Sequence, residues 1–207
     1  MQCNDKDRRL DVYISSVPCK GKYKTKFLRL LKLVKTRLIW GYRLHSLDRR
    51  TVLSSSLQVN NPSVVSIGSY VTIEKDFVLA DLCIDKKRTP KIIIGNGCTI
   101  LYRFQCNAAL SVTIGNNVLI ASNVLITDSD HVVEPGAVPV TKNNKLISCP
   151  VSIEDNCWIG QNAIILKGVT IGHDSIIGAN SVVTHSVPPC SVVAGNPGRV
   201  INTLACI

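Results

Sequence analysis

A six-residue period runs through the second half of the chain and constrains the fold more than any other feature. Aliphatic residues recur at every sixth position, at Ile153, Ile159, Ile165, Ile171, Ile177 and Val183. Four positions after each stands a small or β-branched residue, at Cys157, Ala163, Val169, Ser175, Ser181 and Val187. An α-helix repeats its faces every 3.6 residues and a plain strand every second residue. The six-residue period therefore predicts neither an α-helix nor a plain strand. It predicts a chain that turns a corner after each short strand.

The same template continues upstream, at Ile114, Ile120 and Ile126, and more sparsely at Ile94 and Ile67. Each hexad supplies one short strand whose aliphatic residue points inward, and successive coils pair at about 4.8 Å. The pattern resembles the hexapeptide repeat of the left-handed parallel β-helix, in which three hexads form one triangular coil. The resemblance predicts an all-β solenoid over residues 60–201, followed by a short tail, 202–207.

The segment that precedes the solenoid, residues 1–59, is basic. Between residues 20 and 50 there are eleven Lys and Arg against a single acid, Asp48, so this stretch alone carries the +10 formal charge of the whole chain. "KTKFLRLLKLVKTRLIWGYRL" predicts a short amphipathic helix with Lys and Arg on one face. Its predicted apolar face comprises Phe27, Leu30, Leu31, Val34, Leu38 and Trp40 or Ile39.

Two interpretations of this helix stay open. Its apolar face can cap the open end of the solenoid, whose last coil would otherwise expose strand edges. Alternatively, residues 20–50 make a peripheral contact with the anionic inner face of a membrane or with an acidic glycan. Nucleic acid is not expected as a partner. The charged start of the chain lacks the apolar core of a signal peptide, which predicts a cytoplasmic protein.

The nine cysteines are odd in number and form no C-x-x-C pair. This spacing argues against a disulfide framework and against a structural zinc site. We expect the cysteines mostly to fill small positions in the core.

The six-residue period is interrupted once over a long stretch. Ile126 and Ile153 are 27 positions apart, which is not a multiple of six, so residues 127–150 are predicted to leave the wall as an extruded loop. A long loop in so regular a solenoid is typical of a functional site. It carries "TDSDH", with His131 next to Asp130, and Trp158 follows in an outward-facing position where the wall resumes.

"TIGNNVLIASNVLITDSDH" and "IEDNCWIGQNAIILKGVTIGHDSIIGANSVVTHSVPPCSVVAGNPGRVI" resemble one branch of the hexapeptide-repeat acyltransferases. That branch contains maltose, galactoside, nodulation-factor and polysaccharide O-acetyltransferases. The resemblance implies a homotrimer that uses acetyl-CoA as cosubstrate, with no metal, and a catalytic site at His131, Trp158 and Asp130. It carries the family's acetyl-CoA contacts to Ala121, Gly160, Ala179, Thr184, His185 and Arg199.

The histidine suits that chemistry, because an imidazole with a pKa near 6.5 can take the proton of an attacking hydroxyl at neutral pH. Asp128, Asp130 and Glu134 remain alternative groups for orienting His131. The family often has Lys where His185 stands, and its sugar-contacting positions fall on Leu101 and Ala109. A galactoside is therefore not the expected acceptor. The "TDSDH" loop favours the polysaccharide branch of the family, which implies a sugar hydroxyl of a bacterial capsule, O-antigen or exopolysaccharide.

Three other functions are compatible with a solenoid of this kind. An acetyltransferase of a free sugar, a sugar-nucleotide amine or an antibiotic is the alternative enzyme. A scaffold would need neither the histidine loop nor the "AGNPGRV" ending. A carbonic anhydrase needs three histidines on zinc, but His173 and His185 are two hexads apart and fall on different faces.

Overall fold

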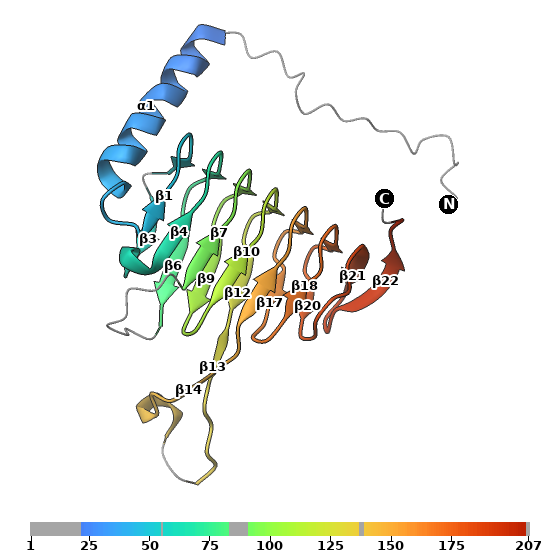
Figure 1. The fold of residues 1–207 in the computed structure, drawn as a ribbon. Helices are drawn as coiled ribbons and strands as arrows, with labels where there is room; N and C mark the ends of the chain where they lie inside the picture. The colour runs from blue at the N-terminus through green and yellow to red at the C-terminus, as the bar shows by residue number, and fades with distance from the viewer. Residues whose placement is uncertain (1–21, 55, 83–90, 137–138, 206–207) are drawn as a thin grey trace.

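The structure, a computed structural model, describes residues 22–54, 56–82, 91–136 and 139–205. The first 21 residues lie outside the described part, as do Cys3, Cys19, Cys83 and Cys206, so the expectations about them are not addressed by it. The described chain forms one helix followed by a solenoid of short parallel strands, with one hairpin extending from its side (Figure 1).

Successive strands of the solenoid fall in turn on three sheets, which we call faces A, B and C. Face A contains β1 (Ser46–Leu47), β4 (Val65–Ile67), β7 (Ile92–Ile94), β10 (Val112–Ile114), β15 (Val151–Ile153) and β18 (Thr170–Ile171). Face B contains β2 (Val52–Leu53), β5 (Thr72–Ile73), β8 (Thr99–Ile100), β11 (Leu119–Ile120), β16 (Trp158–Ile159), β19 (Ile176–Ile177), β21 (Ser191–Ala194) and β22 (Arg199–Thr203). Face C contains β3 (Gln58–Val59), β6 (Val78–Asp81), β9 (Gln105–Ala108), β12 (Leu125–Thr127), β17 (Ile164–Ile165) and β20 (Val182–Val183).

The pairing within each face is parallel and in register, except that β22 closes face B as an antiparallel strand. Ile120 stands beside Ile159, and Ile159 beside Ile177, all fully buried. The hexad aliphatics thus form ladders along the interior, as the period predicts. The predicted left-handed β-helix is confirmed.

The corners depend on a position that the hexad template did not include. Three residues after the buried aliphatic, Asn117, Asn123, Asn156, Asn162, Asp174 and Asn180 all adopt a left-handed backbone, with φ between 56° and 60°. Asn and Asp tolerate this conformation better than other residues with side chains. Their side chains also bond from coil to coil, as Asn123 to Asn162 at 3.1 Å and Asn162 to Asn180 at 2.9 Å.

The solenoid begins earlier than predicted. Strands β1, β2 and β3 pair with β4, β5 and β6, so the first coil starts at Ser46 rather than at residue 60. The signal is present in the sequence, because Leu47, Leu53 and Val59 are also six residues apart. The glycine that follows many later aliphatics is missing there, which hides the repeat.

Helix α1 (Lys22–Trp40) contacts the first coil at the end of the solenoid opposite to β22 (Figure 1). The Thr36 hydroxyl donates to the Leu53 carbonyl and accepts its N–H, and the Arg37 guanidinium donates to the Leu47 carbonyl at 2.8 Å. Trp40 and Leu44 are buried there. The helix does dock on the first coil, but the residues that do so are not those of the predicted apolar face, which is exposed except at Trp40.

Candidate functional site

The predicted loop leaves the solenoid at the corner between faces C and A. Thr127 still belongs to β12, where it pairs with Asn107, so the excursion covers residues 128–150, one residue shorter than predicted. Its stem is a two-stranded antiparallel hairpin of β13 (Ser129–His131) and β14 (Leu146–Ser148). Short 3-10 turns, Val140–Lys142 in the loop and Pro62–Val64 before β4, complete the secondary structure.

Asp128 fixes the neck of this loop. Its carboxylate is fully buried and accepts the backbone N–H groups of Ala109, Leu110 and Ser111, each at 2.7 Å. The Asp128 carbonyl also accepts the N–H of Cys149 from the returning strand at 2.8 Å. Asp128 therefore has a structural role at the base of the hairpin, and its side chain is not the group that orients His131.

His131 stands at the end of β13, opposite Leu146, with an exposed side chain. Neighbouring residues of a strand point to opposite sides, so Asp130 faces away from His131. The Asp130 carboxylate forms an ion pair with Lys167, and Glu134 pairs with Lys145 at 3.1 Å. In the described part of this chain, none of the three candidate acids bonds to the imidazole.

Lys167 belongs to the same corner as the loop. Ile126, Ile165 and Val183 are register partners on face C, so the residues that follow them stack along the C–A edge. Asp128, Lys167 and His185 each stand two positions after one of these aliphatics. Sequence reasoning missed Lys167, although the hexad count would have placed it one coil beyond Asp128.

Thr184 and His185 continue this edge towards the end of the solenoid. The Thr184 hydroxyl and His185 Nδ1 are 2.8 Å apart. His185 and Arg199 both line a hollow of about 320 Å³, together with Val187, Val193 and Gly198. Arg199 lies on β22 and donates to the Gly198 carbonyl at 2.9 Å, and it makes no ion pair within the described residues. Two groups able to carry positive charge thus share one open hollow.

Ala121, Gly160 and Ala179 lie at the other border of face C, the B–C corner. Ala121 and Gly160 follow the paired residues Ile120 and Ile159, and their N–H groups donate to the coil beyond, to Ile159 and Ile177. A Cβ on Gly160 would stand 2.6 Å from the Ile177 carbonyl oxygen, so only glycine fits there without a shift of the next coil. The six predicted cofactor positions are therefore divided between two corners that border the same face.

Trp158 lies on β16 in face B, paired with Leu119 and Ile176, and is half exposed. In a three-faced prism, face B is opposite the C–A corner from which the His131 hairpin emerges. Trp158 lines a hollow of about 390 Å³ with Leu204, Ala205 and Asn156, among others. Trp158 follows the loop in sequence, but within one chain the two lie on different sides of the solenoid.

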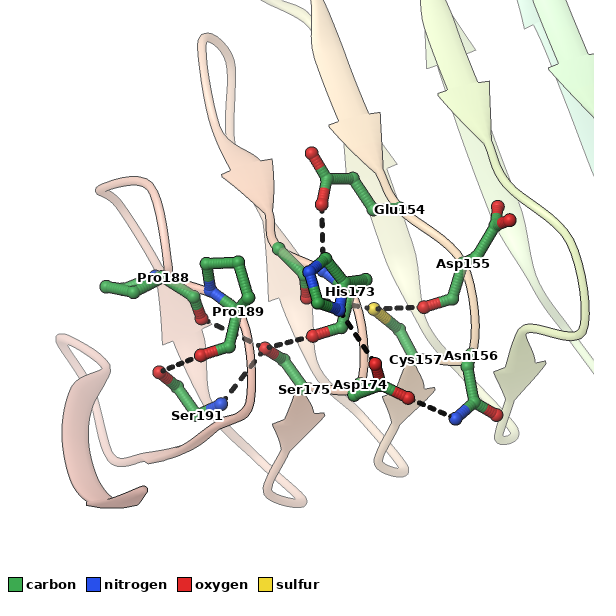
Figure 2. A network of polar contacts seen from close by, with 11 residues as sticks. Glu154, Asp155, Asn156, Cys157, His173, Asp174, Ser175, Pro188, Pro189 and Ser191 are labelled. Atoms are coloured by element: carbon green, nitrogen blue, oxygen red, sulfur yellow. Dashed lines mark hydrogen bonds and ion pairs between the residues drawn. The ribbon is translucent and has the colours of Figure 1, made fainter. Parts of the chain in front are cut away.

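The remaining corner, A–B, carries a polar network that the loop does not reach. Figure 2 shows Glu154 accepting the His173 N–H, and the His173 ring in contact with Asp174 at 2.7 Å. Hydrogen bonds from the Asn156 side chain lower the pKa of Asp174, and those from the Asn116 backbone and amide lower the pKa of Asp155. A hollow of about 580 Å³ lies beside them, the largest of those described, away from the loop.

His173, Asp174 and Cys190 bring one ligand atom each within 4.8 Å of one another, the one such group in the described residues. Cys190 forms a disulfide, however, and a disulfide sulfur is not the thiolate that binds a metal. The expectation for cysteines was thus incomplete, since Cys190 is paired. Cys98, Cys106 and Cys157 are free and buried, as predicted, whereas Cys149 is exposed.

Known proteins share both the repeat and the fold. Residues 150–185 match the family described as "Hexapeptide repeat of succinyl-transferase". Galactoside O-acetyltransferase of Escherichia coli (strain K12) is 47% identical over 94 residues, which cover 45% of this chain and 45% of that protein. A putative lipopolysaccharide biosynthesis O-acetyl transferase of the same organism is 41% identical over 97 residues, covering 44% of this chain and 50% of that one. A galactoside acetyltransferase in complex with coenzyme A superposes with a TM-score of 0.56 at 25% identity, over 92% of this chain and 86% of that chain.

The chain is thus similar to hexapeptide-repeat acetyltransferases in its repeat, over about 45% of its sequence, and in its fold. The chain spans about half the length of the curated relatives it matches. The similarity covers the hexapeptide repeat and the solenoid fold.

Proposed function

We propose that this protein is an acetyl-CoA-dependent O-acetyltransferase that modifies a sugar hydroxyl of a bacterial surface polysaccharide, such as a capsule, O-antigen or exopolysaccharide. The observation that carries the proposal is His131, an exposed histidine at the end of a hairpin whose neck is fixed by Asp128. The names of the relatives support the reaction class, and one of them supports the type of acceptor.

In this proposal the acceptor hydroxyl attacks the thioester carbonyl while a nitrogen of His131 takes its proton. The bond from carbon to sulfur then breaks, and the imidazolium returns the proton to the leaving thiolate, so that the charges balance. A positioned base of this kind accelerates such a step roughly 10²–10⁴-fold. Asp130 acts at a distance, because its ion pair with Lys167 ties the hairpin to the solenoid wall.

The residues at the C-terminal end suit acetyl-CoA, which supplies the activated acetyl group and carries several phosphates. His185 and Arg199 line a shared hollow, and guanidinium groups bind phosphate well. Thr184 adjoins them, and at the B–C border of face C the small residues Ala121 and Ala179 are accessible, whereas Gly160 is buried. We propose that these six residues contact acetyl-CoA.

We further propose a homotrimer with its sites between subunits. His131 and Trp158 lie on opposite sides of one solenoid, so a site that contains both requires a second copy of the chain. A contact from the hairpin of one subunit to face B of the next is heterologous, and such contacts close into a ring when the rotation allows it. Threefold closure would complete each site with residues of two chains.

The first experiment is acetyl transfer by His131→Ala, with His173→Ala as the matched control, because His173 is also exposed but lies on another corner. We expect His131→Ala to retain its fold and lose at least a hundredfold in activity, and His173→Ala to remain near the parent. Activity would be read by NMR on polysaccharides, free sugars, a sugar-nucleotide amine and an aminoglycoside. Turnover only on the small acceptors would favour the alternative enzyme, and no turnover on any of them would favour a scaffold.

The second experiment mixes subunits. Equal amounts of His131→Ala and Trp158→Ala chains, unfolded and refolded together, should restore about one quarter of the wild-type sites if each site takes one residue from each of two chains. Each variant refolded alone serves as the control. An active monomer in sedimentation, or no recovery in the mixture, would contradict the shared site.

A further inference from the structure

Helix α1 exposes a row of apolar side chains. Phe27, Leu30, Leu31, Val34 and Leu38 are between 48% and 74% exposed. They stand at intervals of three and four residues, which places them in one stripe of a helix. A row of this length is unusual on a surface that meets only water.

The stripe faces away from the solenoid. Each residue of a helix is rotated by about 100° from the one before it. On that basis Thr36 and Trp40, which contact the first coil, lie on the side of α1 opposite to Leu31 and Leu38. The docked side of the helix is therefore already occupied. The solenoid of the same chain leaves the stripe exposed, although Val34 also lines a hollow between α1 and the first coil.

Basic residues border the stripe on both sides. The helix contains seven Lys and Arg and no acid. Arg37 lies along one border and Lys35 along the other, and both are exposed. Each border continues into a hollow between α1 and the first coils: Arg37, Arg49 and Arg50 line one, with Asp48. Lys32, Lys35 and Lys75 line the other, with Glu74.

The positive charge of α1 distinguishes between two partners for the stripe, a second copy of the chain and an anionic membrane surface. If the stripes of two copies packed against each other, fourteen positive charges would be brought together without an acid on either helix, which opposes the contact. An anionic surface has the complementary charge, and an amphipathic helix with a basic border lies in the plane of such a membrane with its apolar face among the acyl chains. No helix in the described residues is long and apolar enough to cross a membrane.

We propose that α1 is a membrane-surface anchor: its apolar stripe inserts into the headgroup region of an anionic bilayer, and the basic side chains of the two flanking hollows bind lipid phosphates. The proposal replaces the predicted capping role for the stripe, since Thr36, Trp40 and Leu44 make the contact with the first coil. It is independent of the acetyl-transfer proposal, because it concerns the first coil and uses no residue of the proposed site.

The test is co-sedimentation of the full chain with vesicles of phosphatidylcholine alone and with 30% phosphatidylglycerol. We expect binding only to the anionic vesicles, weakened at least tenfold between 0.1 and 0.5 M salt. The stripe variant Leu31→Gln, Val34→Gln, Leu38→Gln should lose at least tenfold in binding with unchanged thermal stability, because these side chains are exposed and Gln is a good helix former.

The charge variant Arg29→Gln, Lys32→Gln, Lys35→Gln should lose binding as well, whereas the control Arg103→Gln, at a residue that lines neither hollow, should lose little. Equal binding to neutral vesicles, or parental binding by the stripe variant, would overturn the proposal. So would a stripe variant that changes the oligomeric state without lipid, because a second copy would then be the partner. Acetyl transfer to a soluble acceptor, measured alongside, should stay at the parental rate in every variant.

Discussion

Asp128→Asn is the substitution that tests most directly how the loop is held. The Asp128 carboxylate is fully buried. One of its oxygens accepts the backbone N–H of Ala109, and the other accepts those of Leu110 and Ser111. The asparagine amide keeps two of these bonds when its oxygen faces Leu110 and Ser111. Its NH₂ group then faces the N–H of Ala109, which loses its acceptor.

The magnitude follows from the bond to Ala109 and from the charge of the acceptor. A hydrogen bond to a charged group contributes about 1.5–3 kcal/mol, and a buried donor left without a partner costs about 1–3 kcal/mol. Because one N–H is left unpaired and the two remaining bonds lose their charged acceptor, the free energy of unfolding should fall by about 3 kcal/mol. For a chain of this size, each kcal/mol corresponds to roughly 2–4 °C, so the Tm should fall by about 6–12 °C.

The assay is thermal unfolding together with limited proteolysis of the loop. Asp130→Asn is the matched control, because Asp130 belongs to the same hairpin but pairs with Lys167 at the surface, where an ion pair contributes about 0–1 kcal/mol. We expect cleavage between residues 132 and 145 to accelerate in Asp128→Asn. A Tm for Asp128→Asn within 2 °C of that of Asp130→Asn would refute the proposed anchoring role.

Three further outcomes are expected. Arg199→Ala should raise the KM for acetyl-CoA more than it lowers kcat, since phosphate binding is present in both the ground and transition states; an unchanged KM would leave the arginine without a role in binding. Gly160→Ala should destabilise the fold by about 1–3 kcal/mol, and Gly178→Ala should destabilise it by less. The reason is that the added Cβ lies 2.6 Å from a backbone atom of the next coil at Gly160 and 3.1 Å at Gly178. Equal Tm values for the two variants would disprove this. Iodoacetamide at pH 8 should modify the exposed Cys149 and spare the three buried thiols, Cys98, Cys106 and Cys157. Burial raises the pKa values of these three thiols, that of Cys157 to about 11, and so removes the reactive thiolate. Labelling of a buried thiol in the native protein would contradict this expectation.

The sequence alone determines the solenoid, because the hexad is a local code. A buried aliphatic, a left-handed Asn or Asp and a small residue recur within six positions, and each coil repeats the contacts of the one before. The same local regularity shows where the chain departs from the wall, which is why the loop and His131 stand out. It also contained the first coil at Leu47, Leu53 and Val59, which the absence of glycine concealed.

Only the tertiary structure decides how the departures from the repeat are oriented. Asp128 and Asp130 look alike in "TDSDH", yet one is buried under three N–H donors and the other pairs with Lys167, because their neighbours come from coils 17 to 37 residues away. Trp158 follows the loop in sequence but lies on face B, opposite the C–A corner where the loop leaves the solenoid. The reason is that successive strands fall in turn on three faces that point in different directions. In α1 the apolar period predicts a buried stripe, but the first coil contacts the chain only around Thr36, Trp40 and Leu44, so the stripe faces outward. A local pattern specifies that a face is apolar, and the geometry of the coil end decides whether the chain itself can cover it.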